Sequence, residues 1–249
     1  MSRTTTDPRE AARELSSLFS RARRAVFFGG AGVSTASGIP DFRSPDGLYA
    51  QRFAYPPEEM LGHDFFCEHT AEFYEFYRER MVCLGARPNQ AHRKLAELER
   101  DGHLAAVVTQ NIDGLHQAAG SHNVLELHGS VHRNVCRSCG ATYSAEWVVE
   151  GEGAAQAVPH CPACGGLIKP DVVLYGEQLD AGVLGASVEA ISEADLLVVG
   201  GTSLVVYPAA GLLRHFRGDE LVVVNMEPTP ADDLADLVCA CDIARAFDF

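Results

Sequence analysis

Two Cys-x-x-Cys pairs are the clearest chemical signal in the sequence: Cys136 with Cys139, and Cys161 with Cys164. Two residues between cysteines let both sulfurs face one metal ion, and the spacing between the pairs is near that of zinc ribbons. Four thiolates leave no open coordination position, so the pattern predicts a closed, structural Zn²⁺ site. A disulfide or a redox pair is the alternative, and it is weaker because the motif occurs twice in a chain that reads as cytoplasmic.

A second group of reactive side chains follows two apolar runs that are typical of buried strands. The run at 104–109 is followed by Gln110, Asn111, Ile112 and Asp113, and the run at 124–127 is followed by His128. Ligands of open α/β sheets bind at the carboxyl ends of the strands. An imidazole can accept and return a proton near neutral pH. The pattern therefore makes His128 a candidate general base, although most histidines of a globular chain are structural.

Glycines mark the end of an earlier apolar run, residues 25–28. Backbone without Cβ atoms can approach a phosphate closely and offer it free N–H groups, so this stretch is typical of a nucleotide-phosphate loop. It is not the dehydrogenase fingerprint Gly-x-Gly-x-x-Gly, because Thr35 stands where the third glycine belongs and no acidic ribose anchor follows.

The run from Gly30 to Arg43 closely resembles the signature of the sirtuins, the NAD-dependent protein-lysine deacylases. The resemblance extends over nearly the whole chain, including the Leu-His-Gly sequence at His128 and the cysteine pairs. It implies NAD as a consumed co-substrate, structural zinc, and acylated lysine peptides of proteins as partners. In the implied mechanism the amide oxygen of the substrate attacks C1′ of the nicotinamide ribose as nicotinamide leaves. His128 then deprotonates a ribose hydroxyl, and the acyl group ends on ADP-ribose.

The resemblance also assigns roles to single residues. Asp113 would hold the nicotinamide carboxamide, Asn111 would position ribose hydroxyls or a water, and both join His128 in the implied catalytic set. Phe42 would cover the leaving nicotinamide and Arg43 would face the phosphates. The implied NAD-binding residues are Gly30, Ala31, Gly32, Ser34, Thr35, Asp41, Phe42, Arg43, Gln110, Asn111, Ile112, Asp113, Gly201, Thr202, Ser203, Asn225, Met226, Asp242 and Ile243.

Two further expectations concern the acylated substrate. The backbone of Val173, Tyr175 and Gly176 would pair with an extended peptide. In sirtuins that prefer acidic acyl groups, a Tyr-x-x-Arg pair binds the distal carboxylate. Here Tyr77 stands three residues after Tyr74, and Arg78 comes one place later. The departure predicts a preference for acetyl or longer neutral acyl groups over succinyl.

The elements that must position these residues alternate between strand and helix. Helical patterns at 8–23, 88–100, 181–193 and after Pro208 alternate with apolar runs at 25–28, 104–109, 124–127, 196–199 and 221–224. Such alternation predicts an α/β fold with a doubly wound, parallel, Rossmann-like sheet. We expect residues 1–43, 88–132 and 168–249 to form the NAD-binding domain, 44–87 a helical insertion rich in packing aromatics, and 133–167 a zinc-binding module.

The overall composition narrows the functional classes. The 249 residues suit one large domain, or one domain with a small satellite, and their 47% hydrophobic content is ordinary. No apolar run is long enough to span a membrane and residues 1–24 lack the apolar core of a signal peptide, so we expect a cytoplasmic protein. The net charge of −14 argues against direct nucleic-acid binding. Cys67, Cys83, Cys239 and Cys241 follow no pattern and are expected to be reduced, buried or half-buried thiols.

Three alternatives remain at this stage. A hydride-transferring dehydrogenase would share the fold class but needs the missing glycine and acidic anchor. A zinc-ribbon interaction module explains the cysteines but not the polar residues at the predicted strand ends. A protein ADP-ribosyltransferase would use the same NAD site, and the sequence leaves it open as a side activity.

Overall fold

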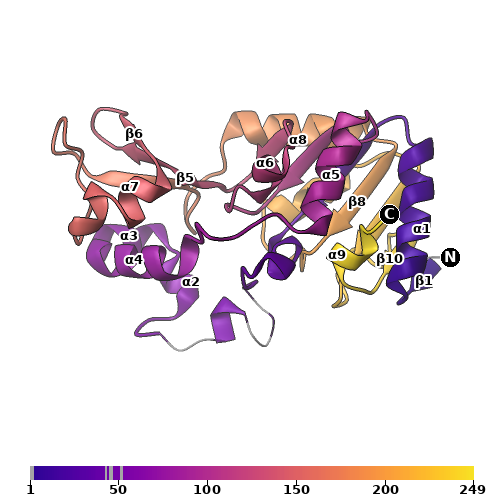
Figure 1. The fold of residues 1–249 in the computed structure, drawn as a ribbon, viewed down its shortest axis with the longest axis horizontal. Helices are drawn as coiled ribbons and strands as arrows, with labels where there is room; N and C mark the ends of the chain where they lie inside the picture. The colour runs from indigo at the N-terminus through magenta and orange to yellow at the C-terminus, as the bar shows by residue number, and fades with distance from the viewer. Residues whose placement is uncertain (1–2, 43, 45–46, 51–52) are drawn as a thin grey trace.

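The computed structural model describes residues 3–42, 44, 47–50 and 53–249, which form a larger body and a smaller lobe. In Figure 1 the larger body lies to the right and holds both termini, while the lobe at the left holds α2, α3, α4, α7 and β6. The chain passes between the two more than once, so neither is a single continuous stretch of sequence.

A seven-stranded sheet forms the centre of the larger body, and every neighbouring pair of its strands is parallel. This confirms the predicted fold class. The edge strand β1 and its neighbour β10, each three residues long, were not predicted. The strand order reverses at β2, since the chain goes on to β3 on one side and returns to β8 on the other. In sheet order the strands are β1 Arg3–Thr5, β10 Leu237–Cys239, β9 Glu220–Val224, β8 Leu196–Gly200, β2 Ala25–Gly29, β3 Ala106–Thr109 and β4 Val124–Glu126.

Helices cover both faces of this sheet. Consecutive residues of β2 face opposite sides of the sheet and are buried in different clusters. Phe27 packs in a cluster with residues of α1, α5 and α9, and Phe28 packs in a second cluster with residues of α8 and η6. The sequence also specifies the helix starts, since Asp7 caps α1 and Asn89 caps α5 through its side chain. The helices are α1 Pro8–Arg21, α5 Gln90–Arg100, α6 Leu115–Ala119, α8 Ala181–Glu193, the 3₁₀ helix η6 Ala209–His215 and α9 Ile243–Ala246.

The helical insertion packs through its aromatic residues, as predicted. Phe65, Phe66, Phe73 and Phe76 are buried in one apolar cluster. Tyr74 and Tyr77 are fully buried beside them. The insertion comprises η3 Leu48–Ala50, α2 Pro57–Met60, α3 His63–Glu68, α4 Thr70–Phe76 and the π-helical turn η4 Tyr77–Met81.

A three-stranded antiparallel sheet carries the cysteine knuckles, in the order β6-β5-β7. Strand β5 begins at Gly129 and β7 ends at Val172, so this sheet reaches past the expected range 133–167 on both sides. The reason is a long-range pairing, Gly129 with Val172, that local sequence patterns do not reveal. The elements are β5 Gly129–Cys136, β6 Thr142–Tyr143, α7 Ala145–Val149, η5 Glu152–Ala155 and β7 Ile168–Val172.

None of the helices in the described residues is both long enough and apolar enough to cross a membrane.

Candidate active site

The glycine loop packs tightly against the end of strand β8. A Cβ atom on Gly30 would lie 2.7 Å from Cβ of Thr202, and one on Gly32 would lie 2.8 Å from Cα of Gly201. The loop continues as two short 3₁₀ turns, η1 Ala31–Val33 and η2 Thr35–Ser37, where a dinucleotide-binding dehydrogenase has its crossover helix. Only glycine fits this approach of two backbones, and the resulting cradle at the strand ends suits the diphosphate of NAD.

Asp113 lies at the centre of a hydrogen-bond network that joins two strand ends. Oγ of Ser34 donates to Oδ2 of Asp113 at 2.6 Å, and Nδ2 of Asn111 donates to Oγ of Ser34 at 3.1 Å. The other carboxylate oxygen of Asp113 accepts the backbone N–H of Leu115 at 2.9 Å. Ser34 and Asn111 are buried, so the carboxylate is held in one orientation by groups that solvent does not compete for.

Gln110 connects this network to the end of β8. Its Nε2 donates to Oγ1 of Thr202 at 3.0 Å, and the same hydroxyl accepts the N–H of Leu204 at 3.2 Å. The ends of β2, β3 and β8 therefore meet in one polar surface, as the strand-end residues predicted.

His128 lies at the junction between the two bodies with a defined orientation. Its Nδ1 is 2.9 Å from the carbonyl oxygen of Gln110, which can only accept, so the proton of the neutral ring belongs on Nδ1. Burial lowers the pKa of His128 from its ordinary value, and the bond to Gln110 opposes that shift. The ring is therefore neutral at neutral pH, and its unprotonated Nε2 can accept a proton. The carbonyl of His128 accepts the N–H of Val173 at 3.0 Å, which ties β5 to the segment after β7.

The four predicted metal ligands come together in the lobe. Their sulfurs all lie within 4.8 Å of one another, with 3.5 Å between Cys136 and Cys164 and 3.7 Å between Cys139 and Cys161. A tetrahedral Zn²⁺ with Zn–S bonds of about 2.3 Å needs sulfurs about 3.8 Å apart. The four cysteines thus fit a closed structural zinc site.

Four other predicted NAD-binding residues follow the strands β9 and β10. Asn225 follows β9 and its Nδ2 donates to the carbonyl of Glu227 at 2.7 Å, while Met226 is 68% exposed. Asp242 caps α9, and Ile243 is buried so close to β8 that a Cβ on Gly200 would lie 2.4 Å from its Cδ1. Ile243 therefore packs against the carboxyl end of β8.

Thr35, Asp41 and Phe42 make contacts outside the Asp113 network. Thr35 is exposed and its hydroxyl donates to the carbonyl of Gly32 at 3.0 Å. The ring of Phe42 packs edge-on against Tyr49, and Asp41 accepts the N–H of Ser44 at 2.8 Å. Arg43 lies outside the described residues.

The structure pairs one part of the expected substrate segment within the chain itself. The backbone of Tyr175 is already paired with the insertion: its N–H donates to the carbonyl of Leu61 and its carbonyl accepts the N–H of His63, both at 2.9 Å. An added peptide strand cannot use those groups. The exposed side chain of Tyr175 instead places its hydroxyl 2.9 Å from that of Tyr49. Sequence reasoning missed Leu61 and Tyr49 as neighbours of this segment, since no local motif marks so distant a contact.

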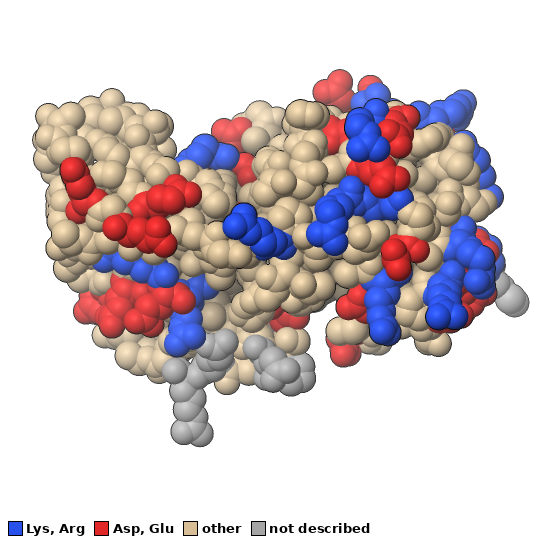
Figure 2. Space-filling view, viewed as in Figure 1, with Lys and Arg blue, Asp and Glu red and all other residues tan. Residues whose placement is uncertain are grey.

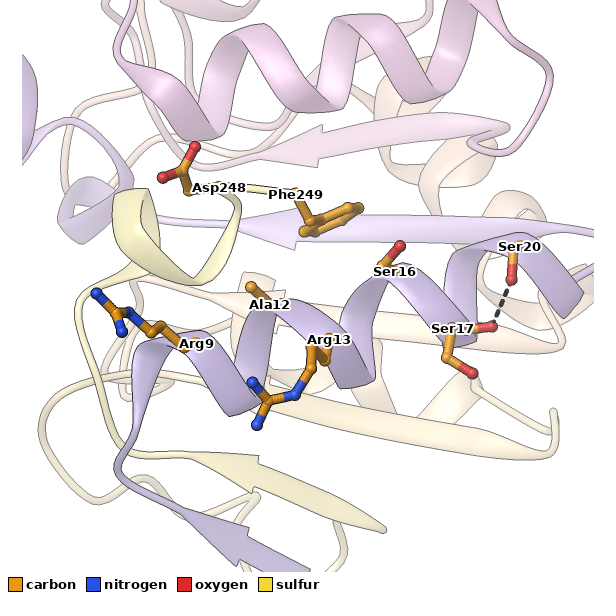
Figure 3. Close-up of a pocket in the computed structure, with 8 residues that line it drawn as sticks. All are labelled: Arg9, Ala12, Arg13, Ser16, Ser17, Ser20, Asp248 and Phe249. Atoms are coloured by element: carbon orange, nitrogen blue, oxygen red, sulfur yellow. Dashed lines mark hydrogen bonds between the residues drawn. The ribbon is translucent and has the colours of Figure 1, made fainter.

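A hollow of about 440 Å³ lies elsewhere, between α1 and the last residues of the chain. Figure 3 shows Arg9, Arg13 and three serines of α1 around it, with Asp248 and Phe249 opposite. None of its lining residues belongs to the strand-end site. The face drawn in Figure 2 carries Lys and Arg side chains interspersed with Asp and Glu over the larger body, without a continuous basic surface.

The chain is similar to known proteins over most of its length. The model of the Sir2 family matches residues 30–208. An NAD-dependent protein deacetylase of Clostridium acetobutylicum is 55% identical over 237 residues, covering 94% of this chain and 96% of that protein. One from Cutibacterium acnes is 56% identical over 215 residues, covering 86% of each.

Solved structures agree with this. A Sir2 complex with a p53 peptide and NAD⁺ has a TM-score of 0.82 at 42% identity, covering 94% of this chain and 95% of that one. A Sir2 structure bound to a propionylated peptide has a TM-score of 0.84 at 41% identity, covering 94% of both chains. The glycine cradle, the neutral histidine beside the Asp113 network and the four-cysteine cluster thus occur in a chain that belongs to the Sir2 family.

Proposed function

We propose that this chain removes acetyl groups from lysine side chains of proteins, with NAD⁺ as a co-substrate, and releases nicotinamide and O-acetyl-ADP-ribose. The observation that carries the proposal is the orientation of His128, whose Nδ1 is bonded to the carbonyl of Gln110 after β3, so that Nε2 of the neutral ring is unprotonated. Two relatives of the chain, at 55% and 52% identity, are named NAD-dependent protein deacetylases.

The strand-end residues account for binding of the co-substrate. The backbone of the glycine loop and of residues 201–203 would receive the diphosphate, and Asp113 would accept a hydrogen bond from the nicotinamide carboxamide. Gln110 and Asn111 would contact the nicotinamide ribose, with Asn225 and residues 242–243 toward the adenosine end. When bound, NAD⁺ supplies an anomeric carbon activated by a good leaving group.

His128 acts as the general base in this proposal. Nε2 takes a proton from a ribose hydroxyl, and the carbonyl of Gln110 stabilises the imidazolium that forms because it accepts the N–H on Nδ1. The lowered pKa of His128 keeps the ring in its unprotonated, reactive form before this step. Positioning and exclusion of water contribute the remaining acceleration, since an amide oxygen is a weak nucleophile.

The acetylated peptide would enter between the larger body and the lobe, along the segment 173–176. Gly176 and the carbonyl of Val173 are candidates for backbone pairing with it, because the N–H of Val173 is bonded to the carbonyl of His128, and Tyr175 would contribute its side chain. The zinc site would hold the lobe that forms one wall of this entrance. The cytoplasmic location and the domain limits stay predictions from the sequence.

Mass analysis of the products tests the proposal. The protein is incubated with NAD⁺ with and without an acetyl-lysine peptide, and we expect equal amounts of nicotinamide, deacetylated peptide and O-acetyl-ADP-ribose only when both substrates are present. ADP-ribose attached to protein without deacetylation would instead identify a transferase. Formation of reduced nicotinamide cofactor would identify a dehydrogenase, and either result would overturn the proposal.

A further inference from the structure

Cys67, His63 and Glu177 form a chain of contacts outside both the zinc centre and the NAD site. Sγ of Cys67 lies 3.5 Å from Nε2 of His63, and Nδ1 of the same ring lies 2.8 Å from Oε1 of Glu177. The sequence predicted Cys67 to be buried or half-buried, but the structure leaves it exposed. Its thiol is therefore accessible to a reagent from solvent.

The ionised carboxylate of Glu177 selects one tautomer of the neutral histidine ring. Burial favours its neutral form, but bonds from the N–H of Leu174, from Lys169 and from His63 hold the pKa of Glu177 below its ordinary value. The second carboxylate oxygen receives the N–H of Leu174 at 2.9 Å and Nζ of Lys169 at 3.0 Å. An ionised carboxylate only accepts hydrogen bonds, so the ring proton belongs on Nδ1 and Nε2 presents its lone pair to the thiol.

The backbone holds these groups in register. His63 and Cys67 are four residues apart on α3, so they share one face of the helix. The N–H of His63 donates to the carbonyl of Tyr175, two residues before Glu177, which joins the start of α3 to the segment that carries the carboxylate. Nucleophile, base and orienting carboxylate thus have the arrangement by which proteins activate a thiol.

We propose that Cys67 is a nucleophilic thiol, activated by His63 and oriented through Glu177, that is oxidised by small hydroperoxides. Nε2 of His63 takes the thiol proton as the sulfur attacks one peroxide oxygen. The O–O bond breaks, and the leaving oxygen takes that proton and departs as water or an alcohol. The sulfur is oxidised to the sulfenic acid and the peroxide is reduced, so no other reactant is needed.

Alkylation rates test the activation of the thiol. The zinc-loaded protein is treated with iodoacetamide at pH 7, and modification of each cysteine is followed by peptide mapping. We expect His63→Gln and Glu177→Gln to slow alkylation of Cys67 by at least about tenfold, a modest share of what a positioned base supplies. Two controls apply: His122→Gln, which changes an exposed histidine outside the cluster, and the rate at Cys83, an exposed cysteine away from it. Neither should change.

Hydrogen peroxide tests the oxidation. Trapping with dimedone should label Cys67 in the native protein and not in Cys67→Ser, with less label in His63→Gln. If Glu177→Gln does not fold, His63→Gln decides alone, because its backbone bond to Tyr175 does not need the ring. Equal alkylation of Cys67 in the native protein and His63→Gln, or no dimedone adduct at Cys67, would overturn the proposal.

Discussion

Oγ of Ser34 donates a 2.6 Å hydrogen bond to the carboxylate of Asp113. The two residues come from the ends of neighbouring strands, β2 and β3, and are 79 positions apart in the sequence. Because Ser34 also accepts a hydrogen bond from Asn111, one hydroxyl orients two side chains that the resemblance to the sirtuins implies for NAD binding. Ser34 is therefore a positioning residue of the proposed nicotinamide site.

Replacing this hydroxyl tests the assignment. Ser34→Ala removes the donor to Oδ2 of Asp113, which keeps only the N–H of Leu115 on Oδ1, and it removes the hydroxyl that accepts from Asn111. A hydrogen bond to a charged group is worth about 1.5–3 kcal/mol, so kcat/KM for NAD⁺ should fall about tenfold to hundredfold. The loss should appear mainly in KM for NAD⁺, with little change in KM for the peptide. Thr35→Ala, which removes an exposed hydroxyl of the same loop, is a control for the loop itself and should cost less.

His128→Ala should lower deacetylation by about 10²–10⁴-fold, the usual contribution of a positioned base. Binding of NAD⁺, measured by calorimetry, should stay near that of the native protein because other groups hold the co-substrate. Near-native turnover of this variant would contradict the assignment.

The pH profile gives a second readout for His128. Because burial lowers the pKa of His128 from its ordinary value of 6.5, the ring is still largely neutral at pH 6.5. As the pH falls, kcat/KM should therefore decline only at pH values below 6.5. A decline centred above 6.5 would indicate a different titrating group.

The sequence allowed the strands of the parallel sheet and the zinc ligands to be predicted because both leave local patterns. The buried strands read as short apolar runs, and the cysteine pairs have a spacing that only a metal site readily explains. Strands β1 and β10 were not predicted: β1 is the polar sequence Arg3–Thr5, and β10 has only the three residues Leu237–Cys239.

Contacts between distant segments could not be predicted. The bond that fixes the ring of His128 goes to a backbone carbonyl, which every residue has, so residue type gave no signal. Likewise, His63 and Glu177 are 114 positions apart, and only the packing of the insertion against the segment after β7 brings them together. The backbone pairing of Tyr175 with Leu61 and His63 is another such contact between distant segments.

Removal of one zinc ligand tests the structural role of the metal. Cys161→Ala should release zinc and lower the melting temperature, because binding energy of a structural zinc contributes directly to folding. Cys83→Ala is the matched control, since Cys83 is a cysteine outside the cluster. Metal analysis and thermal unfolding check both variants, and a native protein without zinc would refute the assignment.

His116 should make the protein less stable in acid. It is buried, neither ring nitrogen has a hydrogen-bond partner among the described residues, and its ring lies 4.7 Å from that of His92. Burial lowers the pKa of His116 to about 3, so between pH 6.5 and 3 the unfolded chain binds a proton that the folded chain does not. Stability is then full above pH 6.5 and is lost as the pH falls.

From pH 7.5 to pH 5 this difference amounts to about 2 kcal/mol for His116 alone. His116→Leu removes the titrating group while keeping an apolar side chain, so its free energy of unfolding should fall less over that range. Urea unfolding at the two pH values measures it for both proteins. An equal loss in the variant would show that other groups cause the acid sensitivity.

The two side chains that a carboxylate-binding acyl pocket would need are committed elsewhere. The hydroxyl of Tyr74 donates to the carbonyl of Ile168. The guanidinium of Arg78 donates to four backbone carbonyls of the lobe, at 2.8–3.5 Å, which belong to Val148, Gly153, Gln156 and Ala157. Arg78 thus stabilises the turn after α7, and its N–H groups donate to carbonyls there.

Acetyl-lysine peptides should therefore be better substrates than succinyl-lysine peptides of the same sequence. A buried succinyl carboxylate without a cationic partner costs at least several kcal/mol, which predicts a preference for acetyl of about hundredfold or more in kcat/KM. Arg78→Gln should lower the melting temperature, because it removes bonds that hold the turn, and should leave the ratio of the two kcat/KM values unchanged. A succinyl peptide that is the better substrate, with an advantage that Arg78→Gln abolishes, would show that Arg78 leaves its carbonyl partners to bind the substrate.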